Sequence, residues 1–310
     1  METYYFSQVI PNLFIGLCKG SFVLRPYSTN FGMNLSYKVQ RLEPRMVIDT
    51  GETVNPDAIC SSSSVGNTIV IEWTEAEKPN ERKERQLERY SHVTSKNVIE
   101  LLAIPANEAK TTDICLIVTP DAGSNFNELL TSKKWYFPLL SFTKTEMGYT
   151  LKRCANDFCE EQTNQFFSNN MTFERIPLGY LPLPLDENIN EKLVARIVAR
   201  HALSVLIRGE RNSSIEEFCS GYITIWDKID NLKRKLIRSA TKNTLIRLSK
   251  HESIKEYLQR DSADTALWHF KGGPELLKKI RSVQKGINQI LAIIEGEKSQ
   301  MELPFDDEKH

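Results

Sequence analysis

The sequence predicts an α/β protein that begins with a mixed sheet flanked by helices and continues into a mainly helical region. In the first 180 residues, short apolar and β-branched runs alternate with turn-forming and charged helical segments. Further along, apolar residues recur at spacings of three and four, as in amphipathic helices. At 310 residues the chain is long enough for two globular domains. We expect one domain over 1–180, a second over 181–296 and an acidic tail over 297–310.

The predicted sheet starts after an opening segment that has no regular pattern. Residues 1 to about 40 are rich in aromatic residues, glycine and asparagine, which favours irregular structure or short strands. From residue 45 onward the chain contains three short apolar runs, MVIDTGE, NPDAIC and NTIVIEW. The segment SSSSVGN between the last two is small and turn-forming. We expect these last two runs to form a β-hairpin.

One charged segment and two further apolar runs complete the first predicted domain. Residues 75–93 are strongly charged and free of glycine, and Pro79 suits a first helical turn, so we expect a helix. Residues 113–120, DICLIVTP, predict a buried strand. Residues 135–143 predict another strand, in which Pro138 indicates an edge position or a bulge.

Acidic and polar side chains in the hairpin and in the following helix would lie along one rim of the sheet. Asp57 follows a proline at the start of one strand, and Glu72 lies near the end of the paired strand. Two such carboxylates can converge on a divalent cation that prefers oxygen ligands. Gln86 and Tyr90 are four residues apart and share a helix face directed toward that strand end. Glu52, in an earlier turn, is a candidate third metal ligand.

This combination resembles the PD-(D/E)XK nuclease superfamily over roughly residues 40–145. In that superfamily, acids on two neighbouring strands hold the metal, and a lysine two residues beyond the second acid orients the attacking water. Its RecB-like branch adds a Gln-x-x-x-Tyr signature, which Gln86 and Tyr90 match. The resemblance implies a restriction-endonuclease-like core in which Asp57 and Glu72 hold Mg²⁺ or Mn²⁺. It also implies that Gln86 and Tyr90 position the scissile backbone of DNA.

The sequence departs from this pattern at Thr74, which stands where the superfamily has its lysine. A neutral hydroxyl cannot supply the fixed positive charge that lowers the barrier to phosphoryl transfer. A lysine on the following helix, Lys78 or Lys83, is a candidate substitute. The alternative is that both lysines belong to a solvated face that also carries several glutamates. The sequence therefore leaves open whether the protein is an enzyme.

The second predicted domain is basic, although the whole chain has 40 basic and 40 acidic residues. Between Glu191 and Lys285 there are 20 basic and 11 acidic side chains. A cationic helical stretch at 232–250 can neutralise several phosphates, and it fits a helix-turn-helix or winged-helix module. The alternative is a solvated surface helix, and in either case we expect its apolar residues, Leu232 and Leu236 included, to face a core. The candidates for DNA contact are Lys233, Arg234, Lys235, Arg238, Lys242 and Arg247.

The tail contains the hexapeptide QMELPF, which resembles the peptide by which bacterial proteins dock onto the replication sliding clamp. Gln300, Met301, Leu303 and Phe305 would make that contact, in a peptide-in-groove mode. The alternative is a frayed amphipathic tail. Elsewhere no apolar run approaches the length of a membrane span, and the amino-terminal residues lack a signal-peptide pattern. We expect a cytoplasmic protein without membrane contact.

These features together predict a DNA-acting protein. It would be a PD-(D/E)XK-type nuclease or nuclease-like subunit in restriction, phage defence, transposition or repair, and would hydrolyse phosphodiester bonds with Mg²⁺ or Mn²⁺ if active. The alternative is a catalytically inactive subunit that binds DNA and assembles with an active partner protein. A third interpretation is a protein-interaction module unrelated to DNA. Metal-dependent cleavage and salt-dependent DNA binding would separate the three.

Overall fold

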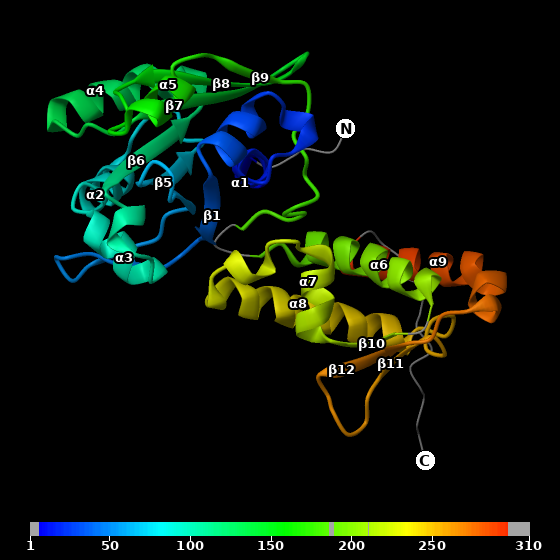
Figure 1. Ribbon diagram of the computed structural model, residues 1–310. Coiled ribbons are helices and arrows are strands. Elements are labelled where there is room, and N and C mark those ends of the chain that lie inside the picture. Colours follow the sequence, from blue (N-terminus) through cyan, green and yellow to red (C-terminus); the bar gives the residue numbers. More distant parts are fainter. Residues whose placement is uncertain (1–5, 186–188, 210, 297–310) are drawn as a thin grey trace. The chain divides into compact units, whose positions relative to one another are not determined.

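The computed structural model describes residues 6–185, 189–209 and 211–296 (Figure 1). The described chain forms two compact units. The first contains the residues up to Leu185 together with the short segment Asp227–Asn231, where the backbone N–H of Asp230 donates to the carbonyl of Leu42 at 3.1 Å. The second contains the remaining described residues.

The first unit is built on a seven-stranded mixed sheet (Figure 1). The three central strands β5, β6 and β7 are parallel, and every other neighbouring pair is antiparallel. Strand β6 is apolar over most of its length because both of its faces are covered. In spatial order the strands are β1 (Tyr37–Leu42), β4 (Ala58–Ser62), β5 (Asn67–Thr74), β6 (Thr111–Val118), β7 (Leu139–Thr145), β8 (Gly148–Ala155) and β9 (Met171–Phe173).

The predicted hairpin is confirmed as β4 and β5, which pair with Ala58 opposite Ile71. Gly66 closes the turn at a φ of 71°, a left-handed conformation that glycine adopts without steric cost. The first predicted run, MVIDTGE, is not part of this sheet. Only Met46–Val47 forms a strand, β2, and it pairs with β3 (Thr53–Val54) in a separate two-stranded ribbon.

Three helices cover one face of the sheet in the first unit. Their buried residues, such as Leu87 and Phe126, share a core with Val70 and Leu116 of the strands. The predicted helix within 75–93 is confirmed, and Asn80 caps it by accepting a hydrogen bond from the backbone N–H of Lys83. The three helices are α2 (Glu81–Tyr90), α3 (Ser95–Leu102) and α4 (Gly123–Lys133).

The opening segment is helical, so the expectation of irregular or short-strand structure is wrong for most of it. Helix α1 (Phe6–Cys18) is followed by two short helical turns before β1 begins. Pro11 lies inside α1, which weakens the sequence signal for this helix. Phe31, which follows α1, is fully buried and stacks on Tyr37 of β1 with ring centroids 4.3 Å apart. Tertiary packing of aromatic rings therefore organises this segment.

Pro138 directly precedes β7, which lies inside the sheet between β6 and β8. The expected edge position is therefore wrong. The pairing of β7 with β8 does shift register directly after the proline, between Leu139 and Leu140, which agrees with the other expectation, a bulge. The carbonyl of Pro138 accepts from the backbone N–H of Leu116 at 2.9 Å.

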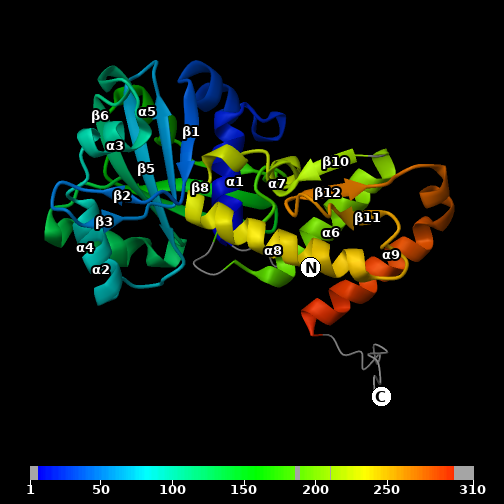
Figure 2. The same cartoon turned by 90° about the horizontal axis from the view of Figure 1, so that it is seen from below.

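The second unit follows the order helix, strand, helix, helix, strand, strand, helix (Figure 2). Its three short strands pair in the spatial order β10, β12, β11, all antiparallel. Ser214 and Glu217 form a capping box at the start of α7. The elements are α6 (Glu191–Arg208), β10 (Arg211–Ser214), α7 (Ile215–Tyr222), α8 (Asn231–Lys250), β11 (Leu258–Arg260), β12 (Leu267–Phe270) and α9 (Pro274–Glu295). The predicted α/β class, with a mixed sheet flanked by helices, is confirmed.

Candidate functional site

Three side chains of α2 converge on the carboxylate of Glu72, near the end of β5. The ammonium of Lys83 donates to Oε1 of Glu72 at 2.6 Å, and the amide of Gln86 donates to the same oxygen at 2.8 Å. The hydroxyl of Tyr90 donates to Oε2 at 2.8 Å. Positions 83, 86 and 90 are three and four residues apart, so they share one face of the helix. We call these four residues the Glu72 cluster.

The Glu72 cluster is largely removed from water. The side chain of Glu72 is 5% exposed and that of Lys83 is 11% exposed, while Tyr90 is fully buried. Hydrogen bonds to ionised groups are short and strong, particularly where water does not compete. Burial, and then the charge of Glu72, raise the pKa of the Tyr90 hydroxyl well above its ordinary value. Tyr90 is therefore a neutral donor that orients Glu72.

Asp57 lies beside this cluster, immediately before β4. Its backbone N–H donates to the carbonyl of Ile71, and its Oδ2 accepts from the backbone N–H of Trp73 at 2.7 Å. Burial raises the pKa of the Asp57 carboxyl well above its ordinary value, and the negative charges of Glu72 and Glu43 raise it further. The Trp73 N–H and Lys83 oppose this shift only in part. Burial is thus the main reason why the Asp57 carboxyl holds its proton more tightly than an exposed aspartate would.

Glu43 is the residue of this site that sequence reasoning missed. Its backbone N–H donates to the carbonyl of Asp57 at 2.9 Å, and its φ of 52° lies in the left-handed region, which is uncommon for residues other than glycine. Such conformations persist where the surrounding structure imposes them, often near functional sites. Glu43 follows β1 and shows no periodicity or motif, so no sequence signal connects it with Asp57.

The structure distinguishes between the two lysines proposed as substitutes for the residue missing at Thr74. Lys83 contacts Glu72, so the solvated-face interpretation is wrong for this residue. Lys78 is exposed in the loop between β5 and α2, and no contact joins it to Glu72 within the described part of the chain. The hydroxyl of Thr74 accepts from the backbone N–H of Ala76 at 3.3 Å and takes no part in the cluster.

Glu52, predicted as a third metal ligand, is exposed in the turn between β2 and β3. Its carboxylate accepts from the hydroxyl of Thr50 at 3.4 Å. Across residues 6–185, 189–209 and 211–296, no group of three or more His, Cys, Asp or Glu residues is arranged to hold a metal ion. The structure thus brings Asp57 and Glu72 together without Glu52.

The six basic residues predicted to contact DNA all lie on α8 of the second unit. Two of them are held by Glu216 of α7, with Arg238 at 3.0 Å and Arg234 at 3.8 Å. Arg234 also lies over the ring of Trp226, 6.0 Å from its centroid. The others are Lys233, Lys235, Lys242 and Arg247, of which Lys235 and Arg247 are exposed.

The apolar residues of α8 only partly follow the predicted inward face. Ile237, Leu245 and Leu248 are buried, as expected. Leu232 and Leu236 are 63% and 46% exposed, so the expectation that they face a core is wrong. Both lie in the first turns of α8, where the helix buries few side chains.

The clamp-type peptide, with Gln300, Met301, Leu303 and Phe305, lies outside the described residues. No helix in the described part of the chain is both long and apolar enough to cross a membrane.

No curated protein and no solved structure matches the chain. The family model of the MJECL32 domain matches residues 7–181, more than half of the 310 residues. This segment extends from α1 to β9 and contains Asp57 and the whole Glu72 cluster. The chain therefore belongs to the MJECL32 domain family.

Proposed function

We propose that this protein is a PD-(D/E)XK-type nuclease that hydrolyses phosphodiester bonds of DNA with the help of a divalent metal ion. The observation that carries the proposal is the 2.6 Å contact between Lys83 and Glu72, beside Asp57. A nuclease of this type needs two acids and one lysine around the reacting phosphate. All three residue types meet here, although the lysine comes from α2 instead of β5.

Lys83 has the properties that Thr74 lacks. Its ammonium lies in a site with little water, where a positive charge stabilises a developing negative charge far better than it would in bulk solvent. In the proposed reaction Lys83 orients the attacking water and stabilises the negative charge that develops on the phosphate. A lysine carried on the helix reaches the same acid because α2 packs directly against the end of β5.

The donor set of the site fits Mg²⁺ or Mn²⁺. Mg²⁺ is usually bound by one or two carboxylates together with waters and substrate phosphates, so a site with only two carboxylates suffices. Burial, and then the negative charges of Glu72 and Glu43, raise the pKa of Asp57, and a cation beside Asp57 would favour its ionised form. Asp57 and Glu72 would hold the ion, which would supply positive charge beside the reacting phosphate.

Gln86 and Tyr90 act on Glu72 in this proposal, and not directly on the DNA backbone. Both side chains donate to the Glu72 carboxylate, and Tyr90 has no exposed surface with which to reach a substrate. Their hydrogen bonds fix the orientation of a metal ligand. Mutation of such supporting residues typically lowers metal affinity or activity by about 10- to 100-fold.

The second unit supports DNA binding in the same proposal. Its order of elements and its sheet order β10, β12, β11 match a winged-helix arrangement, with α8 in the place of the recognition helix. Because Arg234 and Arg238 are paired with Glu216, we assign the phosphate contacts chiefly to Lys235, Lys242 and Arg247. Restriction, phage defence, transposition and repair all use nucleases of this kind.

A second candidate function is a non-catalytic subunit that binds DNA and assembles with an active partner protein. It is favoured by the fact that both oxygens of Glu72 already accept hydrogen bonds from protein donors. A carboxylate satisfied in this way is stable without a cation. Thr74 in the position of the superfamily's lysine also agrees with a loss of catalytic activity.

The deciding experiment is incubation of the purified protein with supercoiled, linear and single-stranded DNA, with Mg²⁺, Mn²⁺ or EDTA. Asp57→Ala and Glu72→Ala variants serve as the site variants, and Glu52→Ala serves as the control because Glu52 lies outside the site. The nuclease proposal expects metal-dependent cleavage in the wild type and in Glu52→Ala, and none in the site variants. DNA binding without cleavage by the wild type would favour the non-catalytic subunit.

A second readout does not depend on activity. Mg²⁺ that binds only the folded protein raises its unfolding temperature, by an amount that grows with the ratio of ion concentration to Kd. We expect this increase in the wild type and in Glu52→Ala, and a smaller one in Asp57→Ala. An equal increase in all three would place the ion outside the proposed site.

A further inference from the structure

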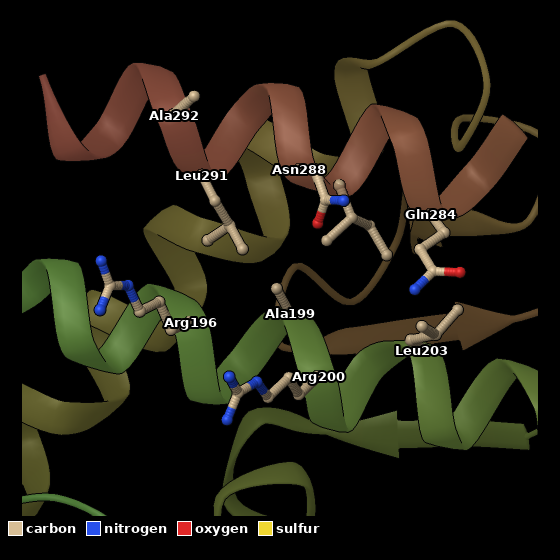
Figure 3. Close-up of a pocket in the computed structure, with 9 residues that line it drawn as sticks. Arg196, Ala199, Arg200, Leu203, Gln284, Asn288, Leu291 and Ala292 are labelled. Carbon is tan, nitrogen blue, oxygen red and sulfur yellow. The ribbon is translucent and has the colours of Figure 1, made fainter. Parts of the chain in front are cut away.

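Helices α6 and α9 of the second unit border an open groove of about 350 Å³ (Figure 3). Neither the Glu72 cluster nor the basic residues of α8 take part in it. Helix α6 contributes Arg196, Ala199, Arg200 and Leu203, and helix α9 contributes Gln284, Ile287, Asn288, Leu291 and Ala292.

The chemistry of the groove differs between its floor and its two rims. The floor is apolar, with Ala199 and Ile287 buried. On the α6 rim, Arg196 and Arg200 are exposed and lie one helical turn apart (Figure 3). On the α9 rim, Gln284 and Asn288 are exposed amides, again one turn apart (Figure 3). Such a groove fits an extended peptide with apolar side chains on one face, carboxylates on the other and main-chain groups for the amides.

We propose that the occupant is the chain's own segment 297–310. This segment contains five acidic residues and two lysines, a sign opposite to that of the α6 rim. Within it Met301, Leu303 and Phe305 occupy alternate positions, and Glu302 lies between the first two. In an extended peptide, alternate side chains point to opposite faces. The three apolar side chains therefore face the floor, and Glu302 and Asp306 lie on the opposite side, where the long side chain of Arg200 can reach a carboxylate.

The position at which the segment leaves α9 allows this docking. Gly296 caps the helix with a φ of 71°, and its N–H donates to the carbonyl of Ile293, so the helix ends there. The groove extends back along α9 from Ala292 to Gln284, eight residues, or about 12 Å at helical rise. Met301 to Phe305 span about 13 Å when extended, which matches the length of the groove, and residues 297–300 are available to reverse the chain direction beyond Gly296.

Arg200 is the residue on which this docking can be tested. It forms no ion pair within the described part of the chain, so its charge is available to a carboxylate of the segment. Arg208 lies at the end of the same helix, is also exposed and does not line the groove. Arg200→Glu and Arg208→Glu therefore make the same charge change on the same helix, and only the first alters the groove.

The docking has a consequence for partners of the segment. Met301, Leu303 and Phe305 are also the residues that resemble a clamp-binding peptide. A docked segment hides them, so docking in the groove and capture by an outside protein exclude one another. The inference does not depend on the nuclease proposal, since it uses neither the Glu72 cluster nor DNA.

The test is hydrogen exchange of the full-length protein, measured by mass spectrometry over residues 297–310. The reference is a synthetic peptide of the same 14 residues. We expect amides near 301–305 to exchange at least about tenfold more slowly in the protein than in the peptide. This factor corresponds to a free energy of docking of about 1.4 kcal/mol. Arg200→Glu should reduce this protection by about threefold or more, while Arg208→Glu should leave it unchanged.

Three results would overturn the proposal. Exchange as fast as in the free peptide would mean that the segment does not dock. Protection that survives Arg200→Glu would place it outside this groove. Protection that rises with protein concentration would mean that the segment of a second copy fills the groove, and not the chain's own. Protection that is independent of concentration and sensitive to Arg200→Glu supports the proposal.

Discussion

Glu72 in the first unit and Glu216 in the second are both carboxylates that hold basic side chains from a neighbouring helix. Glu72 holds Lys83 of α2, and Glu216 holds Arg234 and Arg238 of α8. The difference lies in their surroundings. The Glu72 side chain is 5% exposed, whereas that of Glu216 is 46% exposed. Water and salt screen the ion pairs of Glu216 but hardly reach the pair between Glu72 and Lys83.

Carboxylates that pair with basic side chains of a neighbouring helix can therefore lie in very different environments. A half-exposed ion pair typically contributes between zero and about 1 kcal/mol to stability. A buried ion pair is stable only when its remaining hydrogen-bonding groups also have partners. Gln86 and Tyr90 are such partners for the Glu72 carboxylate. An arrangement of this cost is expected where function requires it.

The largest expected effect concerns catalysis under the nuclease proposal. Lys83→Met should lower the rate of metal-dependent DNA cleavage by about 100-fold or more, because it removes the positive charge beside the reacting phosphate. Lys78→Met is the matched control, since Lys78 is exposed and lies outside the cluster. Single-turnover cleavage assays compare the two variants. Equal rates in both would remove Lys83 from the proposed mechanism.

The next effect concerns folding. Glu72→Ala should lower the free energy of unfolding by about 3 kcal/mol, because it leaves the ammonium of Lys83 buried without a counter-charge. It also leaves the Tyr90 hydroxyl without its acceptor. Urea unfolding followed by circular dichroism measures the change. A loss below about 1 kcal/mol would mean that Lys83 turns outward to water in the variant.

Substitution of Asp57 should change the free energy of unfolding by less than Glu72→Ala does, and in the opposite direction. Because its pKa is raised in the folded state, the folded protein holds this proton more tightly than the unfolded chain does. The contribution of the protonated Asp57 carboxyl to stability is therefore complete at a pH below its pKa in the unfolded chain. This contribution is lost as the pH rises through its pKa in the folded protein. Asp57→Asn removes this loss and should raise the free energy of unfolding at about pH 8 by about 1 kcal/mol.

The pH dependence provides the control for that prediction. At about pH 3, where Asp57 is protonated in both states, the gain from Asp57→Asn should vanish. Thermal unfolding of the wild type and the variant across this pH range measures both limits. A variant that is less stable than the wild type at about pH 8 would contradict the assigned direction of the shift.

The smallest effect is expected at the exposed pair. Arg238→Met should lower the free energy of unfolding by less than about 1 kcal/mol, and this loss should shrink further in high salt. The same urea unfolding experiment, run at low and high salt, measures it. A loss as large as that of Glu72→Ala would remove the distinction drawn between the two carboxylates.

Much of the fold around the site follows from local sequence signals. The alternating runs and the turn at SSSSVGN predict the β4–β5 hairpin, and the charged segment after Pro79 predicts α2. The i and i+4 spacing of Gln86 and Tyr90 places both on one face of that helix. By contrast, α1 and β1 gave no clear signal, because buried aromatic packing and not periodicity organises that segment.

The sequence by itself determined that Asp57, Glu72, Gln86 and Tyr90 belong to one rim of a sheet, since spacing within a hairpin and a helix fixes which side chains share a face. Only the tertiary structure decided that Lys83 joins them while Lys78 and Glu52 do not. The physical reason is that burial and long-range approach depend on how α2 packs against β5. Charge and residue type, which are all that the sequence shows of these lysines, are the same for both.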